Sequence, residues 1–240
     1  MVGGGLANMI GINTCGGQAG AGGGGGFTNT HSTEYDGVDD YVEVTPYAAL
    51  DGATSFSISF WIKPTANVAR YCFFIDGTTD IQFIYRGNSG AEYMDMSLDS
   101  TSYYARSSVG SVPLNQWTHV VWTYDGSQTR YNRYKLYING QSDLNLNSGS
   151  GISSLGTFTK LWIGKRNSSE WTGFFDEFAI YKNTILSQAD ADNIYNGGTP
   201  NDLNNNGLTA PTNWWRFEEG SGTTAIDSGS AGNNGTLING

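Results

Sequence analysis

Apolar and polar side chains alternate along much of the chain after residue 26, and a period of two is typical of β-strands. In Phe56–Ile62, apolar residues occupy every second position and form one apolar face. Trp117–Tyr124 is apolar on both faces, as expected of a strand inside a sandwich. Further apolar stretches predict strands over Leu161–Ile163 and Phe174–Tyr181. The chain is therefore predicted to consist mainly of β-strands.

Turn and cap signals separate these strands and mark a single helix. Tyr134–Ile138 runs into Asn139-Gly140, a dipeptide that favours a tight hairpin because both turn positions take positive φ. A helix is predicted after Ser187, which can cap it together with Asp190, and Gly197 is expected to stop it. Many short strands with one short helix predict an all-β fold, an antiparallel two-sheet sandwich.

The chain divides into a glycine-rich N-terminal arm and one domain. Residues 1–26 hold 12 of the 34 glycines and end in the run Gly22–Gly26. Glycine loses much entropy on ordering, so two interpretations of the arm stand. Either neighbouring subunits hold it in an assembly, or it is a flexible leader. Residues 27–240 are predicted to form a single sandwich domain.

Composition narrows the classes of partner. The chain has 240 residues, with 12 Lys and Arg against 22 Asp and Glu, and its formal net charge is −10. It lacks the basic stripe that binds phosphates, so no nucleic acid is expected. No apolar run approaches the ~20 residues that cross a bilayer, and we expect no export signal or membrane partner. Aromatic residues make up 13% of the chain, which is too much core material for a disordered protein.

Two cysteines, Cys15 and Cys72, are too few for a disulfide scaffold. One bridge between them is an alternative. The favoured interpretation is that Cys72, within the apolar stretch Tyr71–Ile75, is a small core residue.

Five blocks of sequence occur in an order that is found in a known family. They are Tyr35–Val44 (YDGVDDYVEV), Phe56–Pro64 (FSISFWIKP), Asn115–Gly126 (NQWTHVVWTYDG), Leu136–Gly140 (LYING), and Phe175–Tyr181 (FDEFAIY) with the Ser187–Tyr195 helix. These blocks resemble the laminin-G-like domains of the concanavalin A-like lectin/glucanase superfamily, over roughly residues 33–197. The resemblance implies a jelly roll of two curved antiparallel sheets.

The C-terminus departs from that family pattern. Asn213–Gly222, with Asp227 and Asn233–Leu237 behind it, resembles the family's first strand and the loop after it, yet here it comes last. A circular permutation, in which residues 211–240 supply the first strand, is favoured because the aromatic residues of this stretch need a core. The alternative is the truncated start of a second copy. The permuted layout resembles virion structural proteins of marine tailed phages, including the Phe27–Thr30 lead-in.

The sequence gives little support for catalysis. The resemblance to glucanases implies a Glu-x-Asp-x-Glu pattern on one strand face, but the nearest stretch is Glu92–Ser97. Its spacing places Glu92 and Asp95 on opposite faces of a strand. His119 has no nucleophile near it in the sequence and is interpreted as a packed histidine, and His31 has no implied role. We therefore expect a protein without enzymatic activity.

Calcium is the cofactor that the resemblance implies. Family members often hold one Ca²⁺ between the closing strand and the opening hairpin, and this carries over to Asp176 with Asp36, Gly37 and Asp40 opposite. Hard cations of this kind prefer carboxylate and carbonyl oxygens. The alternative is that Asp36 and Asp40 serve the turn through hydrogen bonds to the backbone, while Asp176 has an internal partner.

A second acidic stretch has a different interpretation. Asp202–Gly207 is similar to the first half of an EF-hand loop, but its twelfth position is Asn213 in place of the bidentate Glu. No helix leads into it. We expect a polar loop that links the helix to the last strand.

A glycan site requires exposed aromatic rings beside polar groups. Tyr103, Tyr104 and Arg106 meet this description, and so does Trp171 in the polar stretch Asn167–Thr172. Aromatic residues serve protein interfaces equally well, and some cap the edges of a sandwich. Both alternatives stay open.

These features predict a non-enzymatic structural or assembly protein. The favoured role is a phage virion component at the particle surface, either a capsid decoration or a fibre or appendage subunit, that contacts itself or other virion proteins. The alternative is a calcium-supported carbohydrate-binding adhesion module, extracellular if not on a particle, with a host surface glycan as partner. The two roles are compatible.

Overall fold

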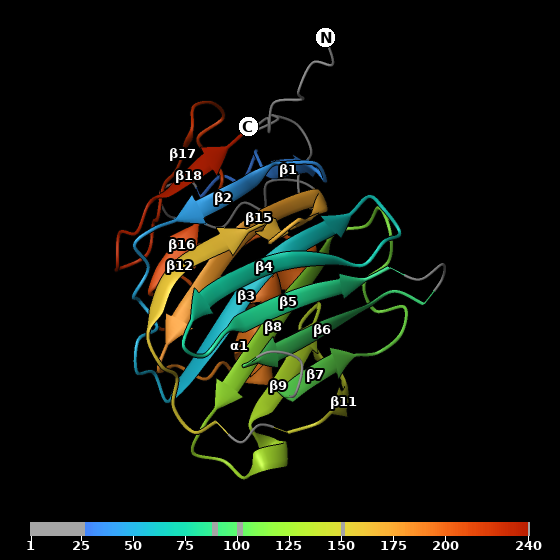
Figure 1. The fold of residues 1–240 in the computed structure, drawn as a ribbon, viewed down its shortest axis with the longest axis vertical. Coiled ribbons are helices and arrows are strands. Elements are labelled where there is room, and N and C mark those ends of the chain that lie inside the picture. The colour runs from blue at the N-terminus through green and yellow to red at the C-terminus, as the bar shows by residue number, and fades with distance from the viewer. Residues whose placement is uncertain (1–26, 88–90, 100–102, 150–151, 240) are drawn as a thin grey trace.

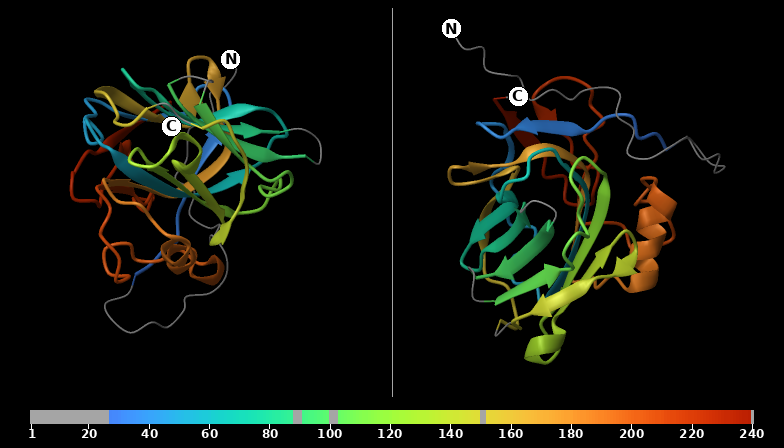
Figure 2. Two further views of the ribbon diagram at one scale, coloured as in Figure 1. Left: turned by 90° about the horizontal axis from the view of Figure 1, so that it is seen from below. Right: turned by 90° about the vertical axis from the view of Figure 1, so that its right-hand side faces the viewer.

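The computed structural model describes residues 27–87, 91–99, 103–149 and 152–239 (Figure 1). The glycine-rich arm, and with it Cys15, lies outside these ranges. Cys72 has a free thiol and is fully buried, as predicted for a core residue. Two antiparallel sheets pack face to face, and one short helix lies outside them (Figure 2), so the predicted all-β jelly-roll sandwich is confirmed.

One sheet has seven strands, and its inner face covers half of the core. Across the sheet, neighbouring strands follow the order β1-β15-β3-β8-β9-β10, and β16 also pairs with β15. Its strands are β1 (Thr33–Asp36), β3 (Ser55–Pro64), β8 (Thr118–Asp125), β9 (Tyr134–Ile138), β10 (Gln141–Ser142), β15 (Thr172–Lys182) and β16 (Asn213–Trp215). Strands predicted from the sequence correspond to β3, β8, β9 and β15.

The other sheet has nine strands in the order β11-β7-β6-β5-β4-β12-β2-β18-β17, and Figure 1 shows its outer face. A separate small hairpin, β13 (Lys165–Arg166) with β14 (Ser169–Glu170), contacts β4. The nine strands are β2 (Tyr41–Val44), β4 (Arg70–Gly77), β5 (Ile81–Arg86), β6 (Tyr93–Leu98), β7 (Tyr103–Ser107), β11 (Leu144–Asn147), β12 (Phe158–Ile163), β17 (Thr224–Ala225) and β18 (Gly235–Ile238).

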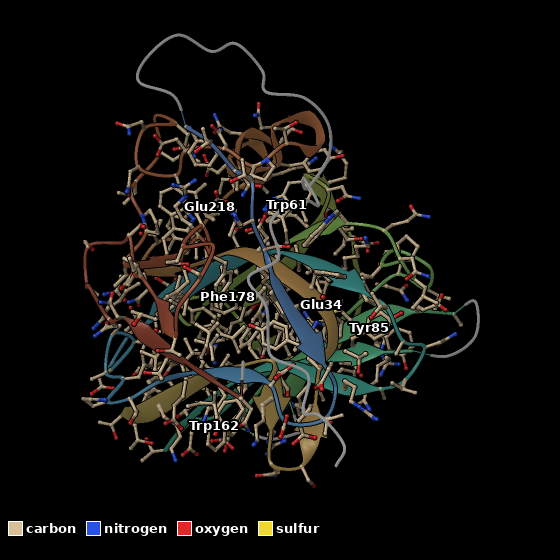
Figure 3. The ribbon with its side chains drawn as sticks, turned by 90° about the horizontal axis from the view of Figure 1, so that it is seen from above. Glu34, Trp61, Tyr85, Trp162, Phe178 and Glu218 are labelled. Carbon is tan, nitrogen blue, oxygen red and sulfur yellow. The ribbon has the colours of Figure 1, made fainter. Side chains whose placement is uncertain are left out.

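The core between the sheets is built from stacked and edge-to-face aromatic rings. The Phe60 ring lies 5.1 Å from Phe83 and 5.8 Å from Phe178, measured between ring centroids. Phe178 lies near the centre of the sandwich in Figure 3. These residues come from β3, β5 and β15, so alternation along each strand brings apolar side chains of both sheets into one core.

Local signals place the turns and the helix as predicted, with one small difference. Asn139 and Gly140 have φ values of 50° and 77°, as a tight hairpin requires. Helix α1 (Gln188–Tyr195) begins with a capping box between Ser187 and Asp190. It ends at Asn196, whose φ of 47° is left-handed, one residue before the predicted stop at Gly197. Asparagine tolerates this conformation better than most residues, so it takes the position.

The C-terminal segment is part of the same sandwich and completes both sheets. β16 pairs with β15, and β18 pairs with β2. Trp215 and Phe217 are fully buried in the main core, while Trp214 packs in a second cluster under α1. Residues 213–238 therefore form strands and core of this domain.

Candidate functional site

Three aspartates at the turn between β1 and β2 form the metal-binding candidate. The carboxylate oxygens of Asp36, Asp39 and Asp40 lie within 4.8 Å of one another. Asp36 also accepts from the backbone N–H of Val38 at 2.8 Å, and Asp40 accepts from that of Asp36 at 3.1 Å, so both support the turn as well. Asp39 was not predicted, although its position beside Asp40 in the sequence is a signal that could have found it.

Asp40 is the member of this cluster that most needs a partner. It is 2% exposed, and its Oδ1 atom has no hydrogen bond. Burial, followed by repulsion from Asp36 and Asp39, raises the pKa of its carboxyl from 3.8 to about 6. A buried oxygen with no donor, next to two exposed carboxylates, fits a hard cation such as Ca²⁺.

The structure does not bring Asp176 to this cluster. In the ladder between β1 and β15, Asp36 lies opposite Thr172 and Thr33 lies opposite Phe175. Asp176 follows at the far end, four residues from the level of Asp36, which corresponds to roughly 13 Å along a strand. Gly37, with φ of 81°, remains in the turn. Of the four predicted metal residues, Asp36, Gly37 and Asp40 therefore lie together and Asp176 lies apart.

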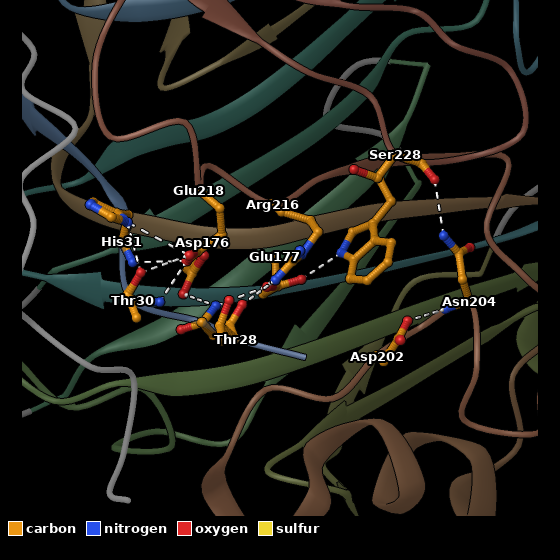
Figure 4. Close-up of polar contacts among 12 residues, drawn as sticks. Thr28, Thr30, His31, Asp176, Glu177, Asp202, Asn204, Arg216, Glu218 and Ser228 are labelled. Atoms are coloured by element: carbon orange, nitrogen blue, oxygen red, sulfur yellow. Dashed lines mark hydrogen bonds and ion pairs between the residues drawn. The ribbon is translucent and has the colours of Figure 1, made fainter. Parts of the chain in front are cut away.

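Asp176 and its neighbour Glu177 instead form a buried acidic pair. The register of β15 shifts between Asp176 and Ala179, and Glu177 has a φ of 51°. Such a bulge re-aims side chains, so two consecutive carboxylates reach one partner. The Asn29 amide donates to Asp176 Oδ2 at 3.0 Å and to Glu177 Oε1 at 2.8 Å (Figure 4).

The segment before β1 covers this pair. Glu218 accepts from the backbone N–H groups of Thr30 and His31, both at 2.8 Å. Arg216 lies 4.4 Å from the ring centroid of Phe27 and 3.5 Å from the carboxylate of Glu177. The acidic pair and the residues after β16 thus attach residues 27–31 to the sandwich.

The chemistry of the pair is that of a buried structural site. Burial raises the pKa of Asp176 well above 3.8 and that of Glu177 to about 7. Perturbed carboxyls are typical of active sites, but Asp176 is fully buried and Glu177 is 3% exposed. Glu177 also accepts from Trp214 Nε1 at 2.5 Å. The pair therefore positions the segment above it.

A shallow pocket of about 300 Å³ lies beside this segment, between Phe27, Asp202, Trp214 and Arg216. The EF-hand-like stretch forms one wall of it. Asp202 accepts from the backbone N–H of Asn204 at 3.1 Å and from the side-chain amide of Asn205 at 2.8 Å. The stretch is a polar loop between α1 and β16, as predicted.

The predicted glycan residues separate into a surface group and a core residue. Tyr104 and Arg106 lie on β7, where the Arg106 guanidinium is 5.5 Å from the Tyr104 ring. Tyr103 begins the same strand. The prediction of Trp171 as an exposed platform is wrong. Its side chain is 1% exposed and its ring packs 5.6 Å from Tyr85, because the polar residues around it lie in the β13–β14 hairpin while the indole turns into the core.

The carboxylates considered for hydrolysis have protein partners. Asp95 accepts from Arg86 and Arg106, and Glu92 accepts from Asn67 at 3.2 Å. His119 is fully buried, with Nε2 2.9 Å from Ser59 Oγ. Burial lowers its pKa to about 3, so it stays neutral in the folded protein. His119 is the packed histidine that the sequence predicted.

Comparisons with known proteins agree with this geometry. Residues 36–191 match the family model of the concanavalin A-like lectin/glucanases superfamily. Among curated proteins, no sequence matches the chain. No helix in the described part of the chain has the length and apolar character needed to cross a membrane.

Solved structures share the fold at low sequence identity. A heptameric SAP-like pentraxin from Limulus polyphemus superposes with a TM-score of 0.56 at 14% identity, covering 68% of this chain and 80% of its own. A putative carbohydrate-binding protein from Bacteroides ovatus superposes with a TM-score of 0.60 at 14% identity, covering 85% of this chain and 58% of its own. Tailspike protein 2 of the Escherichia coli O157:H7 bacteriophage CAB120 superposes with a TM-score of 0.53 at 12% identity, covering 79% of this chain and 27% of its own.

Proposed function

Because the chain belongs to the concanavalin A-like lectin/glucanase superfamily, we propose that it is a non-enzymatic structural domain of a phage particle. In this role it is a surface component of the virion, either a capsid decoration or a fibre or appendage subunit. The fold shared with a bacteriophage tailspike supports the setting. That relationship concerns 27% of the tailspike chain and comes from the fold alone.

The observation that carries the proposal is the attachment of residues 27–31 to the bulge of β15. The 26 residues before this segment include 12 glycines, and glycine allows close approach to neighbouring backbones. A segment fixed to the sandwich gives such an arm a defined origin. We infer that the arm joins the domain to further copies of itself or to other virion proteins.

Light scattering on the full chain and on a chain that starts at Phe27 tests this role. We expect the full chain to form a defined oligomer or a filament and the shortened chain to be a monomer. The oligomer requires the arm, because the strands at the edges of both sheets are short and offer few backbone groups for pairing with another copy. Two monomers of the same shape would contradict the particle role and leave the arm as a tether.

A second candidate function is calcium-supported carbohydrate binding, and the unpartnered Oδ1 of Asp40 favours it. Asp36, Asp39 and Asp40 would hold the ion, which would supply a fixed positive charge at the turn. The turn is joined to the end of the chain, because the Asn239 amide donates to the carbonyl of Asp39 at 3.2 Å. Tyr104 and Arg106 on β7 are the described candidates for glycan contact.

Calcium and pH together test this site. The pKa of Asp40 is raised in the folded protein, so its proton favours folding at low pH and this contribution is lost as pH rises from about 4 to about 6. Ca²⁺ replaces that proton. We expect Ca²⁺ to raise the melting temperature clearly at pH 8 and little at pH 5, and Asp40→Asn to remove the effect.

Asp192→Asn, on the exposed face of α1, is the matched control for the loss of one negative charge. It is expected to keep the full calcium response. An Asp40→Asn protein that responds to Ca²⁺ as strongly as the wild type would exclude the turn as the site.

A further inference from the structure

The outer face of the nine-stranded sheet carries aromatic and basic side chains in contact with one another. Arg106 lies 4.5 Å from the Tyr93 ring and 5.5 Å from the Tyr104 ring. Lys160 lies 4.7 Å from the Trp162 ring, at the other side of the same face. All three rings are half-buried, so each presents part of its surface to solvent. In Figure 3, Trp162 lies at the outside of the sandwich, away from the core residue Phe178.

Strand register places two of these rings, Tyr104 and Trp162, in one row. Across the sheet, Tyr104 lies opposite Ser97, Gln82 lies opposite both Ser97 and Phe74, and Phe74 lies opposite Trp162. Residues directly opposite point to the same face, so the row runs from β7 to β12 over four strand spacings, or roughly 19 Å. The rings of Trp162 and Phe74 stack, with centroids 6.1 Å apart. This length suits an extended polymer better than a single small molecule.

A cluster of side chains on β5, β6 and β7, beside this row, has an excess of positive charge. Asp95, 6% exposed, accepts from Arg86 Nε at 2.9 Å and from Arg106 Nε at 2.6 Å and Nη2 at 3.1 Å. One carboxylate balances only one of the two guanidinium charges. Each guanidinium has five N–H donors, and Asp95 accepts from one of those of Arg86 and from two of those of Arg106. Glu92, the acid that precedes Asp95 in the chain, accepts from Asn67.

The middle of the row holds a buried donor that lacks an acceptor. Gln82 is fully buried and its Oε1 accepts from Arg166, but its Nε2 has no hydrogen-bond partner. Arg166 lies over the row, 4.6 Å from the Phe74 ring. Its Nε atom is likewise unpartnered. Both donor atoms are covered by side chains and do not reach a ligand, so the group that the middle of the row offers is the Arg166 guanidinium over Phe74.

We propose that this face binds an acidic polysaccharide, with Arg86 and Arg106 holding a carboxylate or sulfate of one sugar and the chain extending toward Trp162. Guanidinium groups form paired, charge-assisted hydrogen bonds with such anions. Tyr93 and Tyr104 flank the anion site with half-exposed rings. The chain as a whole carries a charge of −10, so the attraction of a polyanion must be local. This inference rests on the carbohydrate-binding candidate function above.

Affinity electrophoresis of the full chain tests the inference. Separate gels contain polygalacturonate, dextran sulfate or neutral dextran. The three polymers carry carboxylate groups, sulfate groups and no charged groups, so they show which anion the protein binds. We expect one of the two acidic polymers to retard the protein, less so as salt rises, and dextran to leave it unretarded. Arg86→Gln is expected to weaken retention about tenfold, since the remaining arginine is neutralised by Asp95. Trp162→Ala should weaken it as well by removing the far end of the row.

Lys63→Gln is the matched control, because Lys63 also lies over an aromatic ring, that of Phe174, but on the other sheet. It is expected to bind as the wild type does. Melting curves of each variant establish that it is folded, and Arg86 is chosen over Arg106 because its contact with Asp95 is a single hydrogen bond.

Retention by neutral dextran to the same extent would overturn the acidic class while leaving carbohydrate binding in place. Retention by none of the three polymers would overturn the inference. Equal losses in Arg86→Gln and Lys63→Gln would also overturn it, since net charge alone would then explain binding. The particle role is judged separately by light scattering, so the two proposals fail independently.

Discussion

Burial changes the chemistry of His119 more than any neighbouring charge does. Its ring packs against those of Trp61, at 5.0 Å, and Tyr195, at 6.1 Å, and its Nδ1 has no partner. No carboxylate compensates a proton there, so burial alone lowers its pKa from 6.5 to about 3. The histidine that the sequence predicts to be a packing residue is therefore a neutral group in the fold.

This residue makes stability depend on pH in a defined direction. The unfolded chain protonates His119 below about pH 6.5 but the folded protein does not, so its contribution is complete at high pH and is lost as pH falls toward 3. We expect roughly 2 to 3 kcal/mol of this loss between pH 7 and pH 4.5. Urea unfolding at both pH values measures it as the difference between wild type and His119→Gln.

Carboxyls with raised pKa, such as those of Asp40 and Glu177, act in the opposite direction, which is why the comparison between variants is needed. His31→Gln is the control at the chain's other histidine. If His119→Gln lost as much stability as the wild type over this pH range, the assignment of a neutral buried imidazole would be wrong.

Among the elements, β15 carries the features that organise the candidate site. It pairs with β3 along one edge and with both β1 and β16 along the other. Its bulge supplies the acidic pair that receives Asn29. Near its start, Gly173 has a φ of +136°, a conformation that side chains rarely adopt, and the backbone of β3 passes close by.

Gly173 is therefore expected to resist substitution. A Cβ atom at this position would lie 2.3 Å from the carbonyl oxygen of Lys63. We expect Gly173→Ala to reduce the free energy of unfolding by about 3 kcal/mol or more, since strain and a backbone clash add. Gly52→Ala separates the two effects, because Gly52 has a φ of +64° but no atom within 4 Å of the added Cβ. It should cost about 1 kcal/mol, and equal losses in both variants would contradict the clash.

At the scale of the whole molecule, the last strands close the sandwich beside the first ones. β16 shares an edge of β15 with β1, while β18 and β17 extend the other sheet beyond β2. Asp227 ties this segment together by accepting from the backbone of Trp214 at 2.6 Å and from Asn233 at 2.7 Å. This arrangement supports our proposal that residues 211–240 are the family's first strand in a permuted position.

Removal of this segment tests its place in the fold. Deleting residues 211–240 takes β16, β17 and β18 away and uncovers apolar core around Phe178 and Val42. We expect the shortened chain to be insoluble or unfolded, as judged by size-exclusion chromatography and circular dichroism. Deletion of residues 1–26 is the control and should leave the domain folded. A soluble chain of unchanged stability would make the segment an appendage.

Several strands, the hairpin and the helix cap are predictable from the amino-acid sequence, because these depend on residues close together in the chain. Alternation in β3, the φ values at Asn139-Gly140 and the capping box at Ser187 all arise from local sterics and hydrogen bonding. The five family blocks predicted the sandwich, because they indicate which strands occur and in which order. Local patterns suffice where the physical cause is local.

Which chemical groups meet depends on how the strands pair in three dimensions. The register between β1 and β15 separates Asp176 from Asp36, and a bulge joins Asp176 to Glu177 instead. Trp171 is buried although polar residues surround it in the sequence, whereas Trp162 is half-exposed although it stands between the apolar residues Leu161 and Ile163. A shift of one residue turns every side chain of a strand to the other face, so contacts between strands far apart in the chain follow from pairing register and bulges.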